Sequence, residues 1–363
     1  MRSLEGRVIV ITGASAGIGR ATAIEAARGG ARVCLIARAS EGLEEARDEV
    51  AAAAGGDAIA AAVDVADAEG VFAAAATCEQ TLGPIDVWIN NAMATVFGKV
   101  VDVSPQEIAR VTEVTYLGTV HGTMAALRAM RGRNRGTIVQ VGSALAYRGI
   151  PLQAAYCAAK HAVKGFTDSL RSELIHDRSA IRLTEVHLPA IDTPQFDWAR
   201  SHADGDPRPV APVFAVEKAA AAILHAAVHP KRDYWLGLPV PMIVLGQMLA
   251  PGLLDRYLAI GTIEGQSGPR RIRRRRDDNL FAATQGGHAV SGSFGAEARQ
   301  TALLTSGSAA RTGFFVGAGL ASAALGFVAG AVFGRRGRTA STASPSQPGR
   351  GARTRSLPPR TRR

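Results

Sequence analysis

Short apolar runs alternate with longer helical patterns over residues 1–236. Runs of strand length separated by helical patterns are typical of βαβ units. Such units pair their strands in parallel, with helices on both faces of the sheet. The pattern predicts an α/β fold with a doubly wound, mainly parallel sheet of seven strands. The predicted strands are Val8–Ile11, Arg32–Ala37, Ala58–Val63, Asp86–Asn90, Thr137–Val141, Ile181–His187 and Tyr234–Leu236.

Two long helices are predicted around the fifth strand. The first begins at Ser104, a capping residue followed by a proline and an acidic first turn, and continues towards Met130. The second carries Tyr156 and Lys160, which lie on one face because they are four residues apart. This helix is expected to end near His176.

The composition changes after the last predicted strand. Residues 237–267 are apolar and interrupted by prolines, which predicts a lid or membrane-facing segment, with a short amphipathic helix beginning at Pro251. Residues 268–312 are rich in Arg, Gly and Ser, and predict a disordered linker. Residues 313–334 carry no charge over 22 positions, enough to cross a bilayer. Residues 335–363 predict a basic, disordered tail.

The positive charge belongs to the C-terminal end of the chain. The net charge is +11, yet residues 1–269 hold 25 basic and 28 acidic side chains, whereas residues 270–363 hold 17 and 3. A basic tail can contact phosphate or anionic lipid, or serve only as a solubilising extension. Because acidic side chains outnumber basic ones in residues 1–269, the charge of the folded domain argues against nucleic-acid binding.

Cysteine and histidine usage indicates neither a disulfide framework nor a metal centre. The three cysteines, Cys34, Cys78 and Cys157, lack any C-x-x-C pairing and fit a reducing compartment. His225 and His229 form a helical pair without a third ligand nearby, so no metal is expected. The N-terminus has no apolar secretory signal before the first strand, which predicts a cytoplasmic catalytic domain.

A glycine-rich loop, Thr12–Gly19, follows the first predicted strand. Gly13 permits a sharp turn out of the strand, Gly17 lets the backbone approach a pyrophosphate, and Gly19 lets the next helix pack closely on the sheet. The anion would then bind at the helix N-terminus. The loop therefore predicts a dinucleotide site.

Together with Ser143, Tyr156 and Lys160, this loop resembles the short-chain dehydrogenase/reductase family over residues 1 to about 236. The spacing Thr-Gly-x3-Gly-x-Gly is that of the single-domain branch, whereas the longer sugar-epimerase branch has Thr-Gly-x2-Gly-x2-Gly. The resemblance implies a Rossmann fold and hydride transfer between a nicotinamide cofactor and a carbonyl or alcohol.

The resemblance implies catalytic roles for four residues. Tyr156 would be the acid/base, although a free phenol with a pKa near 10 is a poor proton shuttle at neutral pH. Lys160 supplies a cation one turn away, which lowers that pKa, and in the family it also holds the nicotinamide ribose. Ser143 would hydrogen-bond the substrate oxygen. The family's fourth residue, an Asn that helps to hold a water, aligns with Thr115, whose hydroxyl has a different reach.

The choice of cofactor depends on the end of the second strand. An NAD enzyme would place an acid there for the ribose 2′-hydroxyl, but this chain has Ala37 and then Arg38. A guanidinium pairs bidentately with a 2′-phosphate, which predicts NADP(H), a solvated surface arginine being the alternative. The other cofactor-binding residues expected are Gly13, Ser15, Gly17, Ile18, Gly19, Asp64, Val65, Asn91, Ala92, Tyr156, Lys160, Pro189, Ile191 and Thr193.

The substrate pocket is expected between residues 144–153 and 194–214. These segments offer mostly apolar side chains, which predicts a small hydrophobic alcohol or ketone as substrate. The side chains concerned are Leu145, Tyr147, Gln153, Phe196, Trp198 and Phe214.

The expected activity is that of an NADP(H)-dependent carbonyl reductase or alcohol dehydrogenase. Three departures from the family pattern keep an alternative open: Thr115, Met93 in place of a glycine, and Ala190 in place of another. The alternative is a cofactor-binding regulatory protein at the membrane that has lost turnover.

Two expectations concern assembly and location. The resemblance implies a homodimer or homotetramer through the two long helices. The charges flanking 313–334 favour a cytoplasmic C-terminus, while the cofactor requires a cytoplasmic enzyme domain. One crossing satisfies only one of these conditions, which predicts a cytoplasmic enzyme attached to the membrane surface through this C-terminal segment. The segment would be re-entrant, paired with another hydrophobic element, or spanning against the charge rule. A soluble Gly/Ala helix or disordered segment is the alternative.

Overall fold

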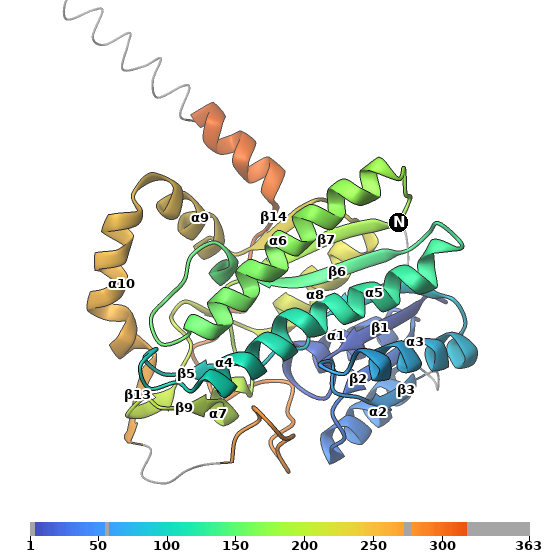
Figure 1. The fold of residues 1–363 in the computed structure, drawn as a ribbon, viewed down its shortest axis with the longest axis horizontal. Helices are drawn as coiled ribbons and strands as arrows, with labels where there is room; N and C mark the ends of the chain where they lie inside the picture. The colour runs from blue at the N-terminus through green and yellow to red at the C-terminus, as the bar shows by residue number, and fades with distance from the viewer. Residues whose placement is uncertain (1–3, 55–57, 272–276, 318–363) are drawn as a thin grey trace, which may run out of the picture. The chain divides into compact units, whose positions relative to one another are not determined.

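A twisted sheet of eight strands forms the centre of the described chain (Figure 1). The structure is a computed structural model that describes residues 4–54, 58–271 and 277–317. The strand order is β14-β12-β7-β6-β4-β1-β2-β3, with parallel pairing except between β12 and β14. The strands are β1 (Val8–Thr12), β2 (Arg32–Ala37), β3 (Ala58–Ala62), β4 (Ile85–Asn90), β6 (Thr137–Ser143), β7 (Arg182–Leu188), β12 (Asp233–Leu236) and β14 (Leu304–Ser306).

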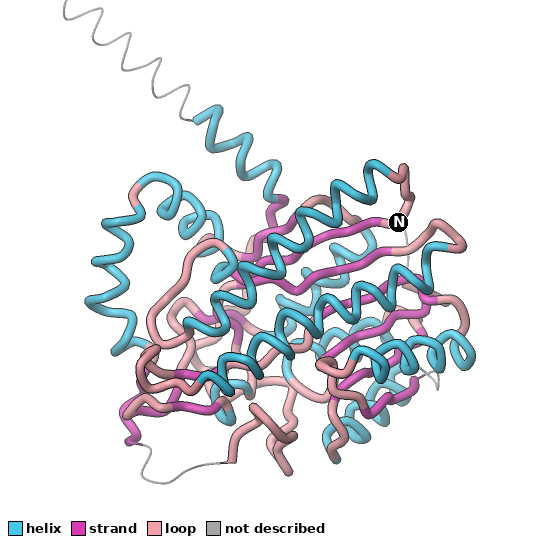
Figure 2. Tube along the Cα trace, viewed as in Figure 1, coloured by secondary structure: helices cyan, strands magenta, loops and turns pink. Residues whose placement is uncertain are grey.

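Helices cover both faces of this sheet, as the alternation of helix and strand in Figure 2 shows. Helices α1, α2 and α8 pack on one face, and α3, α5 and α6 pack on the other. The doubly wound α/β fold predicted from the sequence is confirmed. The helices are α1 (Gly17–Arg28), α2 (Glu41–Ala54), α3 (Ala68–Leu82), α4 (Pro105–Thr112), α5 (Gly118–Arg131), α6 (Ala154–His176), α7 (Gln195–Trp198), α8 (Val216–Val228), α9 (Pro239–Leu249) and α10 (Pro251–Gly265).

The central strands are continuous apolar runs because both of their faces are buried. In β1, Ile9 and Ile11 join the core cluster under α1 and α8, while Val8 and Val10 join the cluster under α3 and α5. All four side chains are fully buried.

The predicted helix from Ser104 to Met130 contains a local irregularity. Its capping box is present, since Ser104 accepts from the Glu107 backbone and the Glu107 side chain accepts from the Ser104 backbone. A π-helical turn, η1 (Glu113–Leu117), separates α4 from α5. Such bulges place side chains that a regular helix would turn elsewhere, and this one contains Thr115.

Three short strand pairs lie beyond the carboxyl edge of the sheet. They are β5 (Val96–Phe97) with β9 (Arg200–Ser201), β8 (Ala190–Ile191) with β11 (Val213–Phe214), and β10 (Gly205–Pro207) with β13 (Ser267–Arg271).

The C-terminal region corrects two expectations. The sheet has an eighth strand, β14, and residues 277–310 belong to the same compact unit as the sheet instead of forming a disordered linker. Strand β14 is only three residues long and contains two hydroxyl side chains, so it lacks the apolar run by which the other strands were predicted. The predicted amphipathic helix at Pro251 is present as α10.

Residues 311–363 form a second unit. Its described part, 311–317, is helical. Most of the predicted membrane helix 313–334, and all of the tail 335–363, lie outside the described residues. Within the described ranges, the structure contains no helix that is both long and apolar enough to span a bilayer.

Candidate active site

The glycine loop has the close contacts that its spacing predicted. Gly13 has a φ of +66°, and a Cβ there would lie 2.8 Å from the Ala92 Cα. A Cβ on Gly19 would lie 2.1 Å from the Gly13 carbonyl oxygen. Gly17 has a φ of +56°, which L side chains rarely adopt. Side chains are therefore excluded where the backbone has to approach a ligand.

Asn91 and Thr12 fix this loop to the end of β4. The Asn91 side-chain amide donates to the Thr12 and Gly13 carbonyls at 3.0 and 3.2 Å. The Thr12 hydroxyl accepts from the backbone amides of Asn91 and Ala92. The carboxyl ends of β1 and β4 are thus held together, at the edge where ligands bind in open α/β sheets.

A cavity lies over this edge, and most of the predicted cofactor residues line it. The lining ones are Gly13, Ser15, Gly17, Ile18, Arg38, Asp64, Val65, Asn91, Ala92 and Thr193. Among the described residues, the predicted Gly19, Tyr156, Lys160, Pro189 and Ile191 do not belong to this wall. Gly19 lies beneath the loop, and Ile191 packs in the apolar core.

Arg38 brings a partly buried positive charge to one end of the cavity. Burial lowers the pKa of its guanidinium, which neighbouring Arg110 also lowers and Asp64 raises. The Arg38 Nη1 atom is buried and has no hydrogen-bond partner among the described residues. Asp64 forms its ion pair with Arg110, so the charge of Arg38 is left to an anion such as a ribose 2′-phosphate.

Ser143 and Tyr156 come together at the carboxyl end of β6. Ser143 is the last residue of that strand, and its hydroxyl accepts from the Leu145 amide at 3.1 Å. Tyr156 lies in the first turn of α6 and is hydrogen-bonded to Ser143. Burial raises the pKa of Tyr156, and the hydrogen bond with Ser143 opposes that increase.

Lys160 lies one turn along α6 and is 4% exposed. Its Nζ donates to the Val141 carbonyl at 2.7 Å and lies 5.7 Å from the centre of the Tyr156 ring. Burial lowers the pKa of Lys160 to about 8. The residue is therefore largely charged at neutral pH. The lowering of the Tyr156 pKa that was expected from this cation is not seen, because burial of the phenol raises that pKa on balance.

The Thr115 hydroxyl makes two hydrogen bonds with the backbone of one loop residue, Ala94. It accepts from the Ala94 amide and donates to the Ala94 carbonyl, both at 3.0 Å, and the side chain is fully buried. Thr115 thus holds the loop after β4, which lines the cavity at Met93 and Ala94.

The expected substrate-pocket residues are separated in the structure. Phe214 is buried in the core, and Trp198 lines the cofactor cavity. The Tyr147 hydroxyl lies 3.2 Å from His187 Nε2, on the side of the sheet end covered by α9. Gln153 donates to Gln266 Oε1 at 2.6 Å, just after α10. Helices α9 and α10 therefore lie against the loop that follows Ser143.

A chain segment with no counterpart in the sequence predictions completes the cavity wall. We call residues 277–299 the strap. The Arg38 side chain donates to the Asn279 carbonyl at 2.7 Å, and the Gly17 amide donates to the Ala289 carbonyl at 3.0 Å. The lining residues that were not among the cofactor-binding residues expected from the sequence are Ala16, Ala37, Ser40, Val63, Met93, Ala94, Val114, Pro194, Gln195, Trp198, Asn279, Leu280, Ala283, Thr284 and His288.

Comparison with known proteins identifies the family that this geometry fits. A family model described as short chain dehydrogenase matches residues 7–204. The chain is 38% identical to an uncharacterized oxidoreductase, YxnA, of Bacillus subtilis, over 79% of this chain and 81% of that protein. It is 35% identical to dehydrogenase/reductase SDR family member 7B of Bos taurus, over 69% of this chain and 80% of that one. It is 39% identical to 2-(S)-hydroxypropyl-CoM dehydrogenase 3 of Xanthobacter autotrophicus, over 47% and 66% of the two chains.

Proposed function

This chain is an oxidoreductase that belongs to the short-chain dehydrogenase family, and we propose that it uses NADP(H) to interconvert a small hydrophobic ketone and its alcohol. The observation that carries the proposal is the joint placement of Ser143, Tyr156 and Lys160 at the carboxyl edge of the sheet that also forms the dinucleotide cavity. A relative named for dehydrogenation of a hydroxypropyl group supports an alcohol as the substrate class.

The proton chemistry follows from the surroundings of Tyr156. When bound, the nicotinamide supplies the hydride for reduction or accepts it in oxidation. Tyr156 is protonated at neutral pH because burial raises its pKa, so it can donate to the oxygen of a ketone as that oxygen gains charge. The charged Lys160 stabilises the phenolate that remains, and the Ser143 hydroxyl is placed to orient the substrate oxygen.

The preference for the phosphorylated cofactor rests on Arg38. Its buried Nη1 has no hydrogen-bond partner among the described residues, and Ala37 stands where an NAD enzyme would carry an acid. Arg38→Asp introduces repulsion against a 2′-phosphate and an acceptor for a 2′-hydroxyl. The variant should therefore reverse the ratio of NADPH to NADH affinity, and an unchanged ratio would make Arg38 a surface residue.

The hydrogen bonds that the Thr115 hydroxyl makes favour a second candidate function. Because both of its hydrogen bonds go to Ala94, it is less suited than the family Asn to hold a water for Lys160. A cofactor-binding protein without turnover would follow if that water is essential.

One assay separates the two candidates. Purified full-length protein is incubated with NADPH and a panel of hydrophobic ketones, with Tyr156→Phe as the matched variant. Wild type should turn over, while the variant keeps its NADPH affinity and loses turnover because only the phenolic proton is removed. NADPH binding without turnover in wild type would favour the regulatory function, and residual activity above about a tenth in the variant would exclude the catalytic assignment.

The assembly is proposed to be a homodimer or homotetramer. Ile108, Leu117 and Met124 are exposed apolar residues along α4, η1 and α5, one of the two long helical segments expected to pair. Light scattering on the purified protein tests this, and a monomer mass would contradict it.

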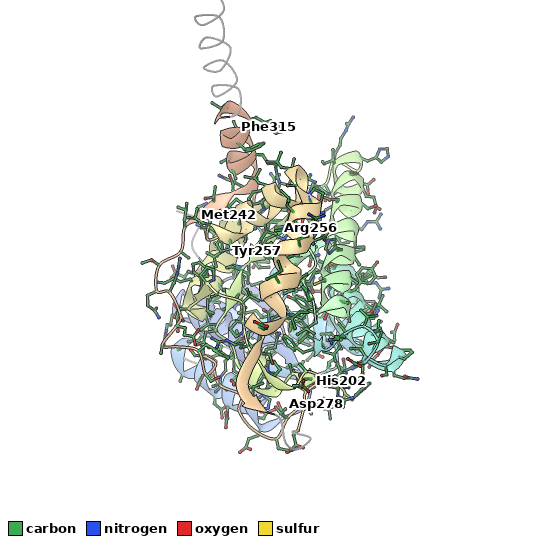
Figure 3. The ribbon with its side chains drawn as sticks, turned by 90° about the vertical axis from the view of Figure 1, so that its left-hand side faces the viewer. His202, Met242, Arg256, Tyr257, Asp278 and Phe315 are labelled. Atoms are coloured by element: carbon green, nitrogen blue, oxygen red, sulfur yellow. The ribbon has the colours of Figure 1, made fainter. Side chains whose placement is uncertain are left out.

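Attachment to the cytoplasmic face of a membrane is proposed through α9 and α10. Met242 on α9 and Tyr257 on α10 are 68% and 73% exposed, and Figure 3 shows both on the face turned to the viewer, with Arg256 beside them. Exposed apolar side chains near a cation suit the boundary between lipid headgroups and acyl chains.

A further inference from the structure

Four residues that line the same cavity each carry a buried polar atom without a hydrogen-bond partner among the described residues. These atoms are Arg38 Nη1, Trp198 Nε1, Asn279 Oδ1 and His288 Nδ1. A buried polar atom left unpaired costs about 1–3 kcal/mol, so such atoms are uncommon in a folded chain. The presence of four such residues around one cavity indicates that a polar ligand satisfies these atoms.

The strap fixes the backbone of Asn279 and leaves its side chain for the cavity. The Asn279 amide donates to the Trp198 carbonyl at 3.2 Å, and its carbonyl accepts from Arg38 at 2.7 Å. The next residue, Leu280, is fully buried, and its carbonyl accepts from Arg110 at 3.1 Å. Both backbone groups are thus paired, while the buried side-chain oxygen of Asn279 has no hydrogen-bond partner among the described residues.

His288 is held from several sides against the start of α2. Its Nε2 lies 2.8 Å from the Thr284 carbonyl, so this nitrogen carries the proton and Nδ1 is the unpaired one. Its ring lies 5.3 Å from the Trp198 ring, centre to centre. A Cβ on Gly42 would lie 2.1 Å from the His288 ring, so glycine is needed at this position of α2. Ser40, two residues earlier, lines the same cavity.

The strap also covers the glycine loop and the first helix. The Gly17 amide donates to the Ala289 carbonyl, and Arg20 donates to the His288 carbonyl. Further along, the Phe294 amide donates to Asp192 Oδ1 at 3.0 Å. These contacts place the strap across the outer side of the site, from the end of β2 to the segment after β8.

We propose that the strap completes the binding site for the adenosine-phosphate half of the cofactor, with Asn279 and His288 as binding residues. The proposal rests on the proposed function, because the ligand that it requires is a nicotinamide dinucleotide. The donors on Arg38 and Trp198 suit phosphate oxygens, and the Asn279 oxygen suits a ribose hydroxyl or the adenine amino group. The strap lies outside residues 7–204, which match the family model.

The test measures cofactor binding by the full chain, using NADPH fluorescence for the dissociation constant and stopped flow for the release rate. Asn279→Ala and His288→Ala should each weaken NADPH binding about five- to tenfold, the effect of one lost hydrogen bond to a ligand. Release should accelerate by a similar factor, because binding changes at one site act mainly on dissociation. Gln285→Ala is the matched control, since Gln285 is exposed on the same strap and does not line the cavity.

A further variant distinguishes ligand contact from a purely structural role. Asn279→Asp keeps the side-chain shape and the backbone contacts but adds a negative charge beside Arg38. It should weaken NADPH more than NADH, because only NADPH carries the 2′-phosphate. A merely structural role for Asn279 would leave that ratio unchanged. Thermal melting of each variant verifies that the fold is intact.

The outcomes separate this inference from the proposed function. If both alanine variants bind NADPH as wild type does while Arg38→Ala is weakened, the strap inference is wrong and the proposed cofactor stands. If wild type prefers NADH, the cofactor choice is wrong, and the same alanine variants measured with NADH decide the inference. If wild type binds neither dinucleotide, both are overturned.

Discussion

Helices α9 and α10 and the strap cover opposite ends of the candidate site, and they are attached by different means. Val240 and Val244 of α9 pack with Ala144 and Trp235 in a small apolar cluster beside the catalytic loop. The strap instead offers backbone carbonyls to donors of the core, including the side chain of Arg38 and the amide of Gly17 in the glycine loop. Helix α9 is held mainly by its own apolar side chains, whereas much of the strap is held through its backbone, with a few side-chain contacts such as those of Leu280 and Asp278 in addition.

The difference has a consequence for how each element can be displaced. Substitutions in α9 itself weaken its apolar attachment, because the free energy gained by burial scales with the apolar area of the side chain. The backbone contacts of the strap are weakened by substitutions of the core residues that donate to them, and by few substitutions in the strap itself, such as that of the buried Leu280. The two ends of the site should therefore respond to different sets of mutations.

The largest expected effect is at the catalytic end, in the variant Lys160→Met. Burial lowers the folded-state pKa of Lys160 to about 8, below the unfolded value of 10.5. Up to about 3 kcal/mol of stability is then lost at pH 7, where both states are protonated. Between pH 8 and 10.5 the unfolded state binds one more proton than the folded state, so wild-type stability rises with pH.

The measurement is thermal unfolding of the cofactor-free protein from pH 6 to 10. Lys160→Met should be more stable than wild type at pH 7, with a difference that shrinks above pH 8. Turnover should be lost, because the variant cannot support ionisation of Tyr156. A constant difference across the pH range would show that Lys160 is not buried as a cation.

The contribution of the strap to cofactor binding is tested by Gly42→Ala, a substitution in α2 that acts on the strap residue His288. The added methyl group would overlap the His288 ring, so this side chain has to leave its place. NADPH affinity should fall about tenfold, equivalent to about 1.4 kcal/mol, while the KM for a ketone stays near its wild-type value. Gly252→Ala in the first turn of α10 is the control, since nothing lies within 4 Å of its added Cβ. Equal effects of the two alanines would contradict the separation of the two ends.

The same contrast explains what the sequence could and could not predict. The seven parallel strands, the capping box at Ser104 and α10 carry apolar periodicity or capping chemistry, and all were predicted. Much of the strap is attached through backbone carbonyls, which every residue type carries, and its few packed side chains, such as Leu280 and Val290, follow no strand or helix period. Its Gly-rich composition instead favoured disorder.

At the candidate site, the sequence indicated residues whose type a dinucleotide requires, and several of them line the cavity. The glycines at 13 and 17 line the cavity because only they permit the turn and the close approach. Phe214 was predicted to line the substrate pocket but lies in the core. An aromatic residue in a loop can serve a pocket or the core equally well, and the Phe214 ring lies close to Gly237, which is distant in sequence. Trp198 was expected at the substrate but its ring packs at a tilt against His288, a residue of the strap that no motif indicated.

The attachment of α9 and α10 is tested by Arg148→Ala. Arg148 lies in the loop after Ser143, donates to Gln247 Oε1 at 2.9 Å and pairs with Asp255 at the start of α10. Its loss should cost about 1 kcal/mol, because Asp255 is largely exposed and the pair is solvent-screened. The KM for a hydrophobic ketone should rise a few-fold, measured at saturating NADPH, with the NADPH dissociation constant unchanged. A matching loss of NADPH affinity would mean that α9 and α10 influence both ends of the site.

The smallest effect on stability is expected on the outer face of α10, where the double substitution Leu253→Ser and Tyr257→Ser removes apolar area that already contacts solvent. The two side chains are 68% and 73% exposed, so the free energy of unfolding should change by less than about 0.5 kcal/mol. If this face lies in the lipid interface, sedimentation of the full chain with anionic vesicles should fall several-fold, because each buried apolar side chain contributes about 1.5–3 kcal/mol to partitioning. Val101→Ser, at a site that is 87% exposed and remote in sequence, is the control for a general loss of surface apolarity. Unchanged sedimentation of the double variant would show that α9 and α10 cover only the catalytic end and do not hold the protein at a membrane.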